Sequence, residues 1–499
     1  MSNISGIIKS IQDIMRKDVG VDGDAQRIGQ LVWLFFLKIF DDRETELELI
    51  EEDYQSPLPE RLRWRDWAAD PEGMTGDALA DFVNDELFPV LKYELPTQGS
   101  MGERARVIRS LFEDAYNYMK SGTLLRQVIN KINEIDFNNT EDRHIFGSIY
   151  EQILKDLQSA GNAGEFYTPR ALTRFIVNRV DPKLEERVLD PACGTGGFLA
   201  CTIDHKREHH VKTSKDEETL QGTLFGVEKK ALPHMLCVTN MILHGIDTPT
   251  HIRHDNTLAR PYKDYGPKDR VDIIVTNPPF GGMEEDGIEN NFPAHLRTRE
   301  TADLFMALII KLLRDGGRAA VVLPDGFLFG EGVKTRLKQT LLEECNLHTI
   351  VRLPNGVFNP YTSIKTNLLF FTKGQPTETI WYYEHPYPPG YKSYSKTKPM
   401  RFEEFQAEID WWGDESDGFK ARQENEQAWA VTRQAIEDRN YNLDIKNPHQ
   451  VEPISYDPDE RLQQYQAQQQ AVAELRDQLK ASLSEALTTA QSKVSKEKP

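Results

Sequence analysis

The sequence predicts an α/β protein built on a doubly wound, mostly parallel β-sheet. Three observations carry this prediction. Short apolar runs with β-branched residues alternate with helical stretches between about 170 and 375, the region before them has helical spacing, and the last segment carries a helical apolar stripe. Alternation of strands and helices is typical of βαβ units, which build parallel sheets with helices on both faces.

The N-terminal region, residues 1–160, is expected to be all-helical. Apolar residues recur at helical spacing in three stretches, separated by turns with Pro or Gly. The run LVWLFFLKIF at 31–40 is too short to span a bilayer and contains Lys38, so a buried helix and no membrane contact are expected. The spaced residues are Ile7, Ile8, Ile11 and Met15, then Leu31, Phe35 and Ile39, then Ile145, Ile149, Ile153 and Leu157.

The central region is expected to supply buried strands separated by helices. The predicted strands are RVLD (187–190), TLFGVE (223–228), VDIIVTN (271–277), RAAVVLP (318–324), HTIVRLP (348–354) and NLLFFTK (367–373). The predicted helices are 197–210, 230–244, 302–314 and 332–344. A loop rather than a helix joins the last two strands, which favours an antiparallel pair at one edge of the sheet.

Two further segments follow the sheet. Residues 376–453 are mixed and aromatic, without a clear period, and predict neither a fold nor a function. Residues 454–499 predict an amphipathic helix, which docks either on its own domain or on a partner. Its stripe consists of Leu462, Tyr465, Val472, Leu475, Leu479, Leu483 and Leu487.

Charge and cysteine content restrict the function classes. The net charge of −19 is unfavourable for a chain that grips a polyanion alone. Either the substrate is not a polyanion, or another subunit carries much of that contact. The cysteines form no CxxC pair and the N-terminus has no signal-peptide pattern, so buried thiols in a reducing cytoplasm are expected. The segment HKREHHVKTSKDEETL at 205–220 is interpreted as a solvated helix end and loop rather than a metal site.

The sequence DPACGTGGFL, residues 190–199, directly follows a predicted strand and opens a helix. Such a turn places backbone N–H groups where a nucleotide-like cofactor can lie, although a tight turn without a ligand has the same local pattern. A dinucleotide site would need GxGxxG. Here the glycine spacing differs and an acid precedes the turn, which suits a cofactor with an amino group and no phosphate, S-adenosylmethionine. The residues assigned to this site are Asp190, Pro191, Ala192, Gly194, Thr195, Gly196 and Gly197.

Two acids downstream extend the cofactor site. Glu228 ends the second strand, where ribose hydroxyls are usually held, although a solvated residue at a helix start is the alternative. Asp255 follows a third strand and is assigned to the adenine amine of the cofactor, with a turn-capping role as its alternative.

The catalytic assignment rests on Asn277, Pro278, Pro279 and Phe280 at the carboxyl end of VDIIVTN. Two consecutive prolines lack N–H donors, which leaves carbonyl oxygens without local competitors. The Asn277 side-chain oxygen and the Pro278 carbonyl can then both accept from one –NH₂ group and aim its lone pair at a methyl sulfonium. Phe280 offers a flat face for a base flipped out of a duplex. Positioning supplies most of the rate in such a displacement.

The order DPACGTGGFL, GVE, NPPF resembles the amino-methyltransferases that act on adenine N6 or cytosine N4. The resemblance implies a Rossmann-like methyltransferase sheet and S-adenosylmethionine as cofactor. GNAGEFYTPRAL at 161–172 is similar to the GxFYTP-type segment that lies over the cofactor in this family, although a packed loop is the alternative. It adds the cofactor-binding residues Glu165, Phe166, Tyr167, Thr168, Pro169 and Arg170.

Nearly the whole chain resembles the modification subunit of type I restriction-modification enzymes, an N6-adenine DNA methyltransferase. That resemblance implies a helical domain (1–160), a methyltransferase domain (161–375) and a C-terminal helix for subunit contact (454–499). The mixed extension (376–453) lies between the last two. It also implies a specificity subunit that reads duplex DNA, a restriction subunit, two copies of this chain per specificity subunit, and a target adenine flipped out of the helix. A separate specificity subunit would account for the negative charge.

Three other functions are compatible with parts of the pattern. A free-standing adenine-N6 or cytosine-N4 enzyme would need its own DNA-reading domain, and cytosine enzymes more often have Ser at the position of Asn277. A protein-glutamine N5-methyltransferase presents the same –NH₂ donors to an Asn-Pro-Pro-aromatic loop. A non-catalytic assembly scaffold would have no need of Asn277 and Phe280.

Overall fold

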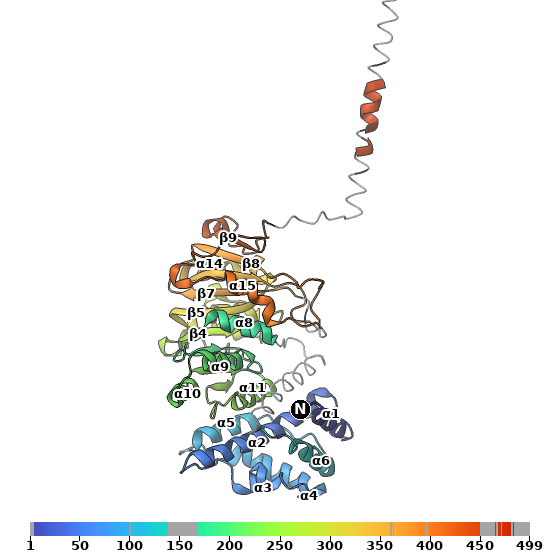
Figure 1. Ribbon diagram of the computed structural model, residues 1–499, viewed down its shortest axis with the longest axis vertical. Coiled ribbons are helices and arrows are strands. Elements are labelled where there is room, and N and C mark those ends of the chain that lie inside the picture. The colour runs from blue at the N-terminus through green and yellow to red at the C-terminus, as the bar shows by residue number, and fades with distance from the viewer. Residues whose placement is uncertain are drawn as a thin grey trace, which may run out of the picture. The chain divides into compact units, whose positions relative to one another are not determined.

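In a computed structural model of the chain (Figure 1), the central region forms the predicted α/β sheet. The structure describes residues 4–99, 101–137, 168–359, 362, 364–395, 398–449, 465, 468–470, 472–480 and 483. Residues Met1–Asn447 form one compact unit and Pro448–Pro499 a second. The division of the chain into four functional parts stays a prediction.

Among the described residues the sheet has nine strands in the order β3-β2-β1-β4-β5-β7-β6-β8-β9. The first five strands in this order, from β3 to β5, each pair in parallel with the next, which confirms the mostly parallel arrangement. The strands are β1 (Val188–Asp190), β2 (Leu224–Glu228), β3 (Ile252–His254), β4 (Val271–Thr276), β5 (Leu313–Pro324), β6 (Cys345–Arg352), β7 (Thr366–Lys373), β8 (Thr379–Glu384) and β9 (Ala428–Thr432).

The loop-joined strands β6 and β7 are antiparallel, as predicted, but they do not lie at the edge of the sheet. β7 inserts between β5 and β6, and β8 and β9 extend the sheet beyond β6. The last two strands come from the aromatic region for which the sequence predicted no structure. Their side chains are packed on both faces, so WYYE and AWAV lack the simple alternation that marks a half-exposed strand.

Helices cover both faces of the sheet. Because neighbouring residues of a strand point to opposite faces, one strand packs against helices on both sides. In β5, Val321 and Leu323 pack with α12 and α14, whereas Ala320 and Val322 pack with α8 on the other face. The helices of this region are α8 (Arg170–Val180), α9 (Gly197–His209), α10 (Ser214–Gln221), α11 (Ala231–Leu243), α12 (Thr301–Leu312), α13 (Asp325–Phe329), α14 (Val333–Glu344), α15 (Gln406–Trp411) and α16 (Arg433–Glu437).

The N-terminal region is helical over its described residues, 4–99 and 101–137, and contains no strand there. The predicted helical stretch 145–157 lies outside the described residues, as do Leu462 and Leu487 of the C-terminal stripe. Within the described ranges, no helix combines the length and apolar character needed to cross a membrane. The N-terminal helices are α1 (Ile4–Met15), α2 (Asp24–Ile50), α3 (Trp64–Trp67), α4 (Gly76–Asp81), α5 (Gly102–Phe112) and α6 (Gly122–Ile132).

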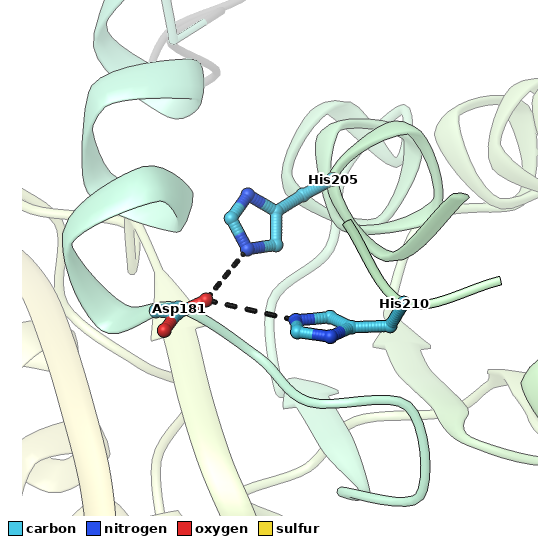
Figure 2. Close-up of side chains that lie close together, drawn as sticks. All are labelled: Asp181, His205 and His210. Atoms are coloured by element: carbon cyan, nitrogen blue, oxygen red, sulfur yellow. Dashed lines mark hydrogen bonds and ion pairs between the residues drawn. The ribbon is translucent and has the colours of Figure 1, made fainter. Parts of the chain in front are cut away.

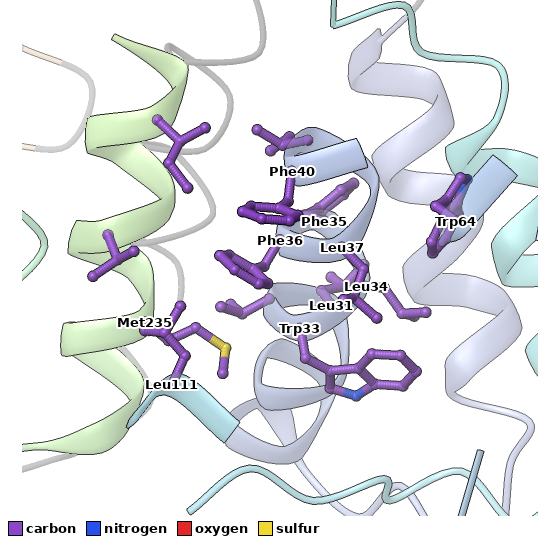
Figure 3. Packing of buried hydrophobic residues seen from close by; sticks show 14 of the residues in the cluster. Leu31, Trp33, Leu34, Phe35, Phe36, Leu37, Phe40, Trp64, Leu111 and Met235 are labelled. Atoms are coloured by element: carbon purple, nitrogen blue, oxygen red, sulfur yellow. The ribbon is translucent and has the colours of Figure 1, made fainter. Parts of the chain in front are cut away.

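The long helix α2 joins this region to the sheet. Figure 3 shows its apolar side chains between Trp64 of α3 and Met235 of α11. Phe36 is fully buried, its ring centroid 5.6 Å from that of Phe40 and 5.9 Å from that of Phe112. The second half of α2 also forms an ion pair between Arg43 and Asp247, with 2.6 Å between Nη2 and Oδ1. The helical region and α11 therefore share one continuous core.

Truncation of Phe36 to Ala tests this shared core. The change removes a buried ring where neighbouring helices cannot collapse freely, so the free energy of unfolding should fall by about 3–5 kcal/mol. Leu49→Ala, at an 84% exposed position of the same helix, should change it by less than about 0.5 kcal/mol. Urea titration followed by circular dichroism measures both, and equal effects of the two substitutions would contradict the shared core.

Candidate active site

A cavity of about 330 Å³ opens at the carboxyl ends of β1, β2 and β4. This is the edge where parallel sheets bind ligands, and β1 and β4 flank the point where the strand order reverses. Of the predicted site residues, the cavity is lined by Thr168, Asp190, Ala192, Gly194, Thr195, Gly197, Glu228, Asn277, Pro278 and Pro279. Residues from segments far apart in the sequence therefore line one cavity.

The glycines of the β1–α9 turn shape the cavity in two ways. Gly194 has a φ of 52°, and a Cβ built there would meet no heavy atom within 4 Å, so its missing side chain leaves open space. Gly196 has a φ of 82°, and a Cβ there would lie 2.8 Å from Cys237 Sγ on α11. Gly194 thus keeps the cavity open, whereas Gly196 lets the turn pack against α11.

The Glu228 carboxylate closes the cavity beside this turn. Its Oε2 accepts from the Gly194 N–H at 3.0 Å, and its Oε1 accepts from the Lys230 N–H at 2.8 Å. Glu228 therefore fixes the glycine turn from the neighbouring strand, in addition to the ribose role predicted for it.

Asp190 connects the cofactor turn to the catalytic loop. Its carboxylate accepts from the Thr276 hydroxyl at 2.6 Å and from the Ala192 N–H at 3.2 Å, and the residue is 1% exposed. Burial raises the pKa of the Asp190 carboxyl to about 7, and nearby Glu228 adds to the rise, whereas the two hydrogen bonds oppose it. Thr276 was not singled out in the sequence, although it directly precedes Asn277 at the strand end.

Asn277 is held in one orientation at the cavity wall. Its Nδ2 donates to the Thr168 hydroxyl at 3.0 Å. Its Oδ1 is buried and has no hydrogen-bond partner among the residues that the structure describes. Buried polar atoms are nearly always paired, so this oxygen is available as an acceptor for a ligand.

The two prolines that follow line the cavity, but Phe280 does not. Phe280 is 3% exposed and meets Phe358 edge to face, with 6.4 Å between ring centroids. The expectation of an accessible stacking face is therefore not met in this structure, because the ring belongs to the core that α12 covers.

Five other predicted residues lie next to the cavity without lining it. Asp255 is exposed and its Oδ1 accepts from the Asn256 N–H at 2.8 Å, which is the turn role held as the alternative. Arg170 forms an ion pair with Asp204, 2.7 Å apart. Of the remaining three, Pro169 is the N-cap residue of α8, the Pro191 carbonyl accepts from the Thr257 hydroxyl at 2.6 Å, and Gly196 packs against α11. Glu165, Phe166 and Tyr167 lie outside the described residues.

The loop after Phe280 forms one wall of the cavity. Gly282, Met283 and Glu284 line the cavity. Lys229 Nζ lies 2.6 Å from Glu284 and 2.8 Å from Glu285, which ties this loop to the end of β2. The acidic, Gly-rich composition of 281–287 was the only signal of this role. The other lining residues missed are Thr173, Cys193, Phe198, Lys230, Pro233 and Thr301.

The raised pKa of Asp190 predicts a pH dependence of stability. Between about pH 4 and pH 7 the folded chain holds a proton at this carboxyl that the unfolded chain has released, so stability declines as the pH rises. Asp190→Asn removes this decline. Between pH 4 and pH 8, the free energy of unfolding of this variant should rise relative to that of the wild type by on the order of 3 kcal/mol. Denaturant titrations at several pH values measure it, and a difference independent of pH would contradict the prediction.

Comparison with known proteins agrees with this geometry. Residues 141–457 match the family model described as N-6 DNA Methylase, and residues 4–132 match the HsdM N-terminal domain. The chain is 68% identical to the type I restriction enzyme EcoEI methylase subunit of Escherichia coli over 485 residues, which span 97% of this chain and 98% of that protein.

Two solved structures are similar over almost their whole length. A modification subunit assigned to a type I restriction enzyme from Vibrio vulnificus YJ016 is 45% identical, with a TM-score of 0.81 and coverage of 91% of this chain and 98% of that one. A chain from a structure of type I R-M complex assembly is 36% identical, with a TM-score of 0.78 and coverage of 97% and 98%. The chain therefore belongs to the N-6 DNA methylase family, among the methylase subunits of type I restriction enzymes.

Proposed function

We propose that the cavity binds S-adenosylmethionine and that Asn277 and Pro278 present the amino group of a target adenine in duplex DNA for methylation at N6. The single observation that carries this proposal is the buried Asn277 Oδ1, which lacks a partner among the described residues while Nδ2 is held by Thr168. An amide held in this way accepts a hydrogen bond from an –NH₂ group and cannot easily turn its own –NH₂ toward it.

The residues around the cavity fit the cofactor. The volume of about 330 Å³ is at the lower end of the range for small-molecule sites. Gly194 leaves space for a ligand against the backbone, and Glu228 has the acceptors that ribose hydroxyls need. We assign Asp190 to the cofactor's amino group, because an adjacent cation would favour the charged form of this buried carboxyl. When bound, the cofactor supplies a sulfonium methyl group as the electrophile.

The chemistry required of the chain is positioning and charge stabilisation. The adenine amino group has two N–H bonds, and we assign Asn277 Oδ1 and the Pro278 carbonyl oxygen as their two acceptors. The nitrogen gains positive charge as its bond to the methyl carbon forms and the carbon–sulfur bond breaks. Both oxygens stabilise that charge, and the surplus proton then leaves the nitrogen to water.

Access of the base to the site involves Phe280 and the 282–284 wall. A flipped base needs a flat partner, and Phe280 is the aromatic residue adjacent to the acceptor pair. We propose that the base displaces the Phe280 ring from its contact with Phe358. Met283, which is exposed beside the cavity, lies on the route that the base would take.

We further propose that the chain acts in the cytoplasm with a specificity subunit that reads the DNA and a restriction subunit that cleaves it, two methylase copies serving one specificity chain. The net charge of −19 supports a division of labour, because phosphate contacts require Lys and Arg from elsewhere. The four cysteines are buried free thiols, consistent with a reducing compartment.

Substitution of Asn277 by Ala tests the assignment. The variant loses one acceptor of the amino group, so methyl transfer measured at saturating cofactor should slow by about 100- to 1,000-fold. The purified chain, its specificity subunit, duplex DNA and methyl-labelled S-adenosylmethionine are mixed, and the DNA is digested to nucleosides. The label should appear in N6-methyladenosine, and only when both chains are present.

Asn130→Ala is the matched control, because its amide donates to the Pro71 carbonyl in the helical region and should not affect transfer. Methyl transfer by Asn277→Ala at the wild-type rate would refute the acceptor role. Label in N4-methylcytosine or in protein glutamine would instead reassign the substrate. Failure of the wild type to label any acceptor, with cofactor bound, would favour a scaffold.

A further inference from the structure

Outside the active site, three potential metal ligands converge where α8 and α9 end. Figure 2 shows Asp181, His205 and His210 turned toward one another. Asp181 Oδ1 lies 2.9 Å from His205 Nε2 and 3.7 Å from His210 Nε2, and the three ligand atoms are all within 4.8 Å of one another. We propose that these residues form a binding site for a zinc ion, with water in the remaining position.

The donor set and its spacing suit zinc. Two imidazole nitrogens and one carboxylate oxygen are common zinc ligands, with bonds of about 2.0–2.2 Å, so the ligand atoms of a tetrahedral site lie roughly 3.4 Å apart. The two separations from Asp181, 2.9 and 3.7 Å, lie on either side of that value. Small rotations of the imidazole rings would therefore close the set around an ion.

The local backbone directs these side chains to one point. α8 ends at Val180, and Asp181 follows with a φ of 51°, a left-handed conformation that Asp tolerates better than most residues. α9 ends at His209, and the His210 N–H donates to the Lys206 carbonyl at 2.7 Å. Both helices thus direct the negative ends of their dipoles toward the site, which favours a cation.

Burial distinguishes this cluster from a solvated helix end. His205 is only 9% exposed, so the interpretation of 205–220 as a solvated stretch is wrong for this residue. His210 Nε2 is also buried, and among the described residues it has no hydrogen-bond partner. Its distance of 3.7 Å from Asp181 Oδ1 is too long for a hydrogen bond, and a bound ion would satisfy this nitrogen.

Nearby cationic side chains would repel the zinc ion but do not prevent its binding. Lys183 forms an ion pair with the other oxygen of Asp181, and its side chain is 55% exposed, so it can turn into solvent. Arg318 donates to the Asp181 carbonyl at 3.2 Å but is itself paired with Glu186 at 2.7 Å. A groove lined by Asp181, His205 and His209 continues to the surface and supplies the path for the ion and for water.

The position of the site gives it a structural role. α8 and α9 pack against each other, and their opposite ends carry Thr168 and the glycine turn at the cofactor cavity. With a rise of about 1.5 Å per residue, α8 places the ion roughly 16 Å from that cavity. Zinc would therefore act as a clamp between the two helices and take no part in methyl transfer.

Zinc titration of the full chain tests the proposal. The chain is treated with a chelator, dialysed and titrated with zinc chloride alone by calorimetry, and its melting temperature is recorded with and without zinc. The wild type should bind one ion per chain and melt at a higher temperature with zinc. In His205→Ala and His210→Gln the affinity should fall by more than about 100-fold, because loss of a ligand exceeds the effect of losing an outer-shell partner.

His295→Ala, at an exposed histidine outside the cluster, should bind zinc as the wild type does. Binding of cobalt(II) separates this site from the Cys193–Cys237 thiol pair, whose sulfurs lie 3.7 Å apart, because only sulfur ligands give the intense charge-transfer band. Circular dichroism checks that each variant is folded. If His205→Ala does not fold, His210→Gln still tests the proposal. No stoichiometric binding by the wild type, undiminished binding by the cluster variants, or a sulfur band would each overturn the proposal.

Discussion

The buried hydrogen bond between Thr276 and Asp190 is the constraint on which the site depends. It joins the ends of β4 and β1, the neighbouring strands at which the strand order reverses. One strand leads into the glycine turn and the other into Asn277-Pro278. Both residues are excluded from water, where a hydrogen bond is electrostatically stronger than at the surface. The distance between the cofactor turn and the acceptor pair is therefore set by the sheet rather than by flexible loops.

The helical N-terminal region supports the same geometry from a distance. Phe36 and its neighbours pack with Met235 of α11 (Figure 3), and Cys237 of α11 lies where a side chain at Gly196 would have to go. The glycine turn is thus pressed against a helix that the N-terminal region holds in place. Damage to the α2 core would therefore disturb the cofactor site through α11, without any direct contact between α2 and the cavity.

Most of the fold followed from local patterns, and the failures have physical causes. The runs RVLD, VDIIVTN and NLLFFTK are buried on both faces and bounded by turns, so their strands were predicted within one or two residues. The order of strands depends on long-range pairing, which is why β7 was not placed between β5 and β6. The strands β8 and β9 were missed because aromatic residues follow one another without a period.

In the candidate site, too, local motifs were predicted from the sequence, whereas contacts between distant residues were not. DPACGTGG and NPPF were found because glycine and proline change the backbone in ways that a sequence reveals. The roles of Thr276, Lys229 and Glu284 depend on neighbours more than fifty residues away or on the next strand. Phe280 and Asp255 were placed by motif position, whereas their actual exposure depends on Phe358 and on the turn at Asn256. His205 was misjudged because burial at a helix end depends on the packing of a second helix.

The central claim is that Asp190 and Thr276 act as one unit that aligns the cofactor turn with Asn277. A double-mutant cycle of Asp190→Asn and Thr276→Val, read as the single-turnover rate of methyl transfer at saturating cofactor, tests it most directly. The account predicts that the double variant is no slower than the slower single variant, which corresponds to a coupling energy of about 0.5–3 kcal/mol. If the double variant is slowed by the product of the factors that slow the two single variants, as expected for independent residues, the claim is contradicted.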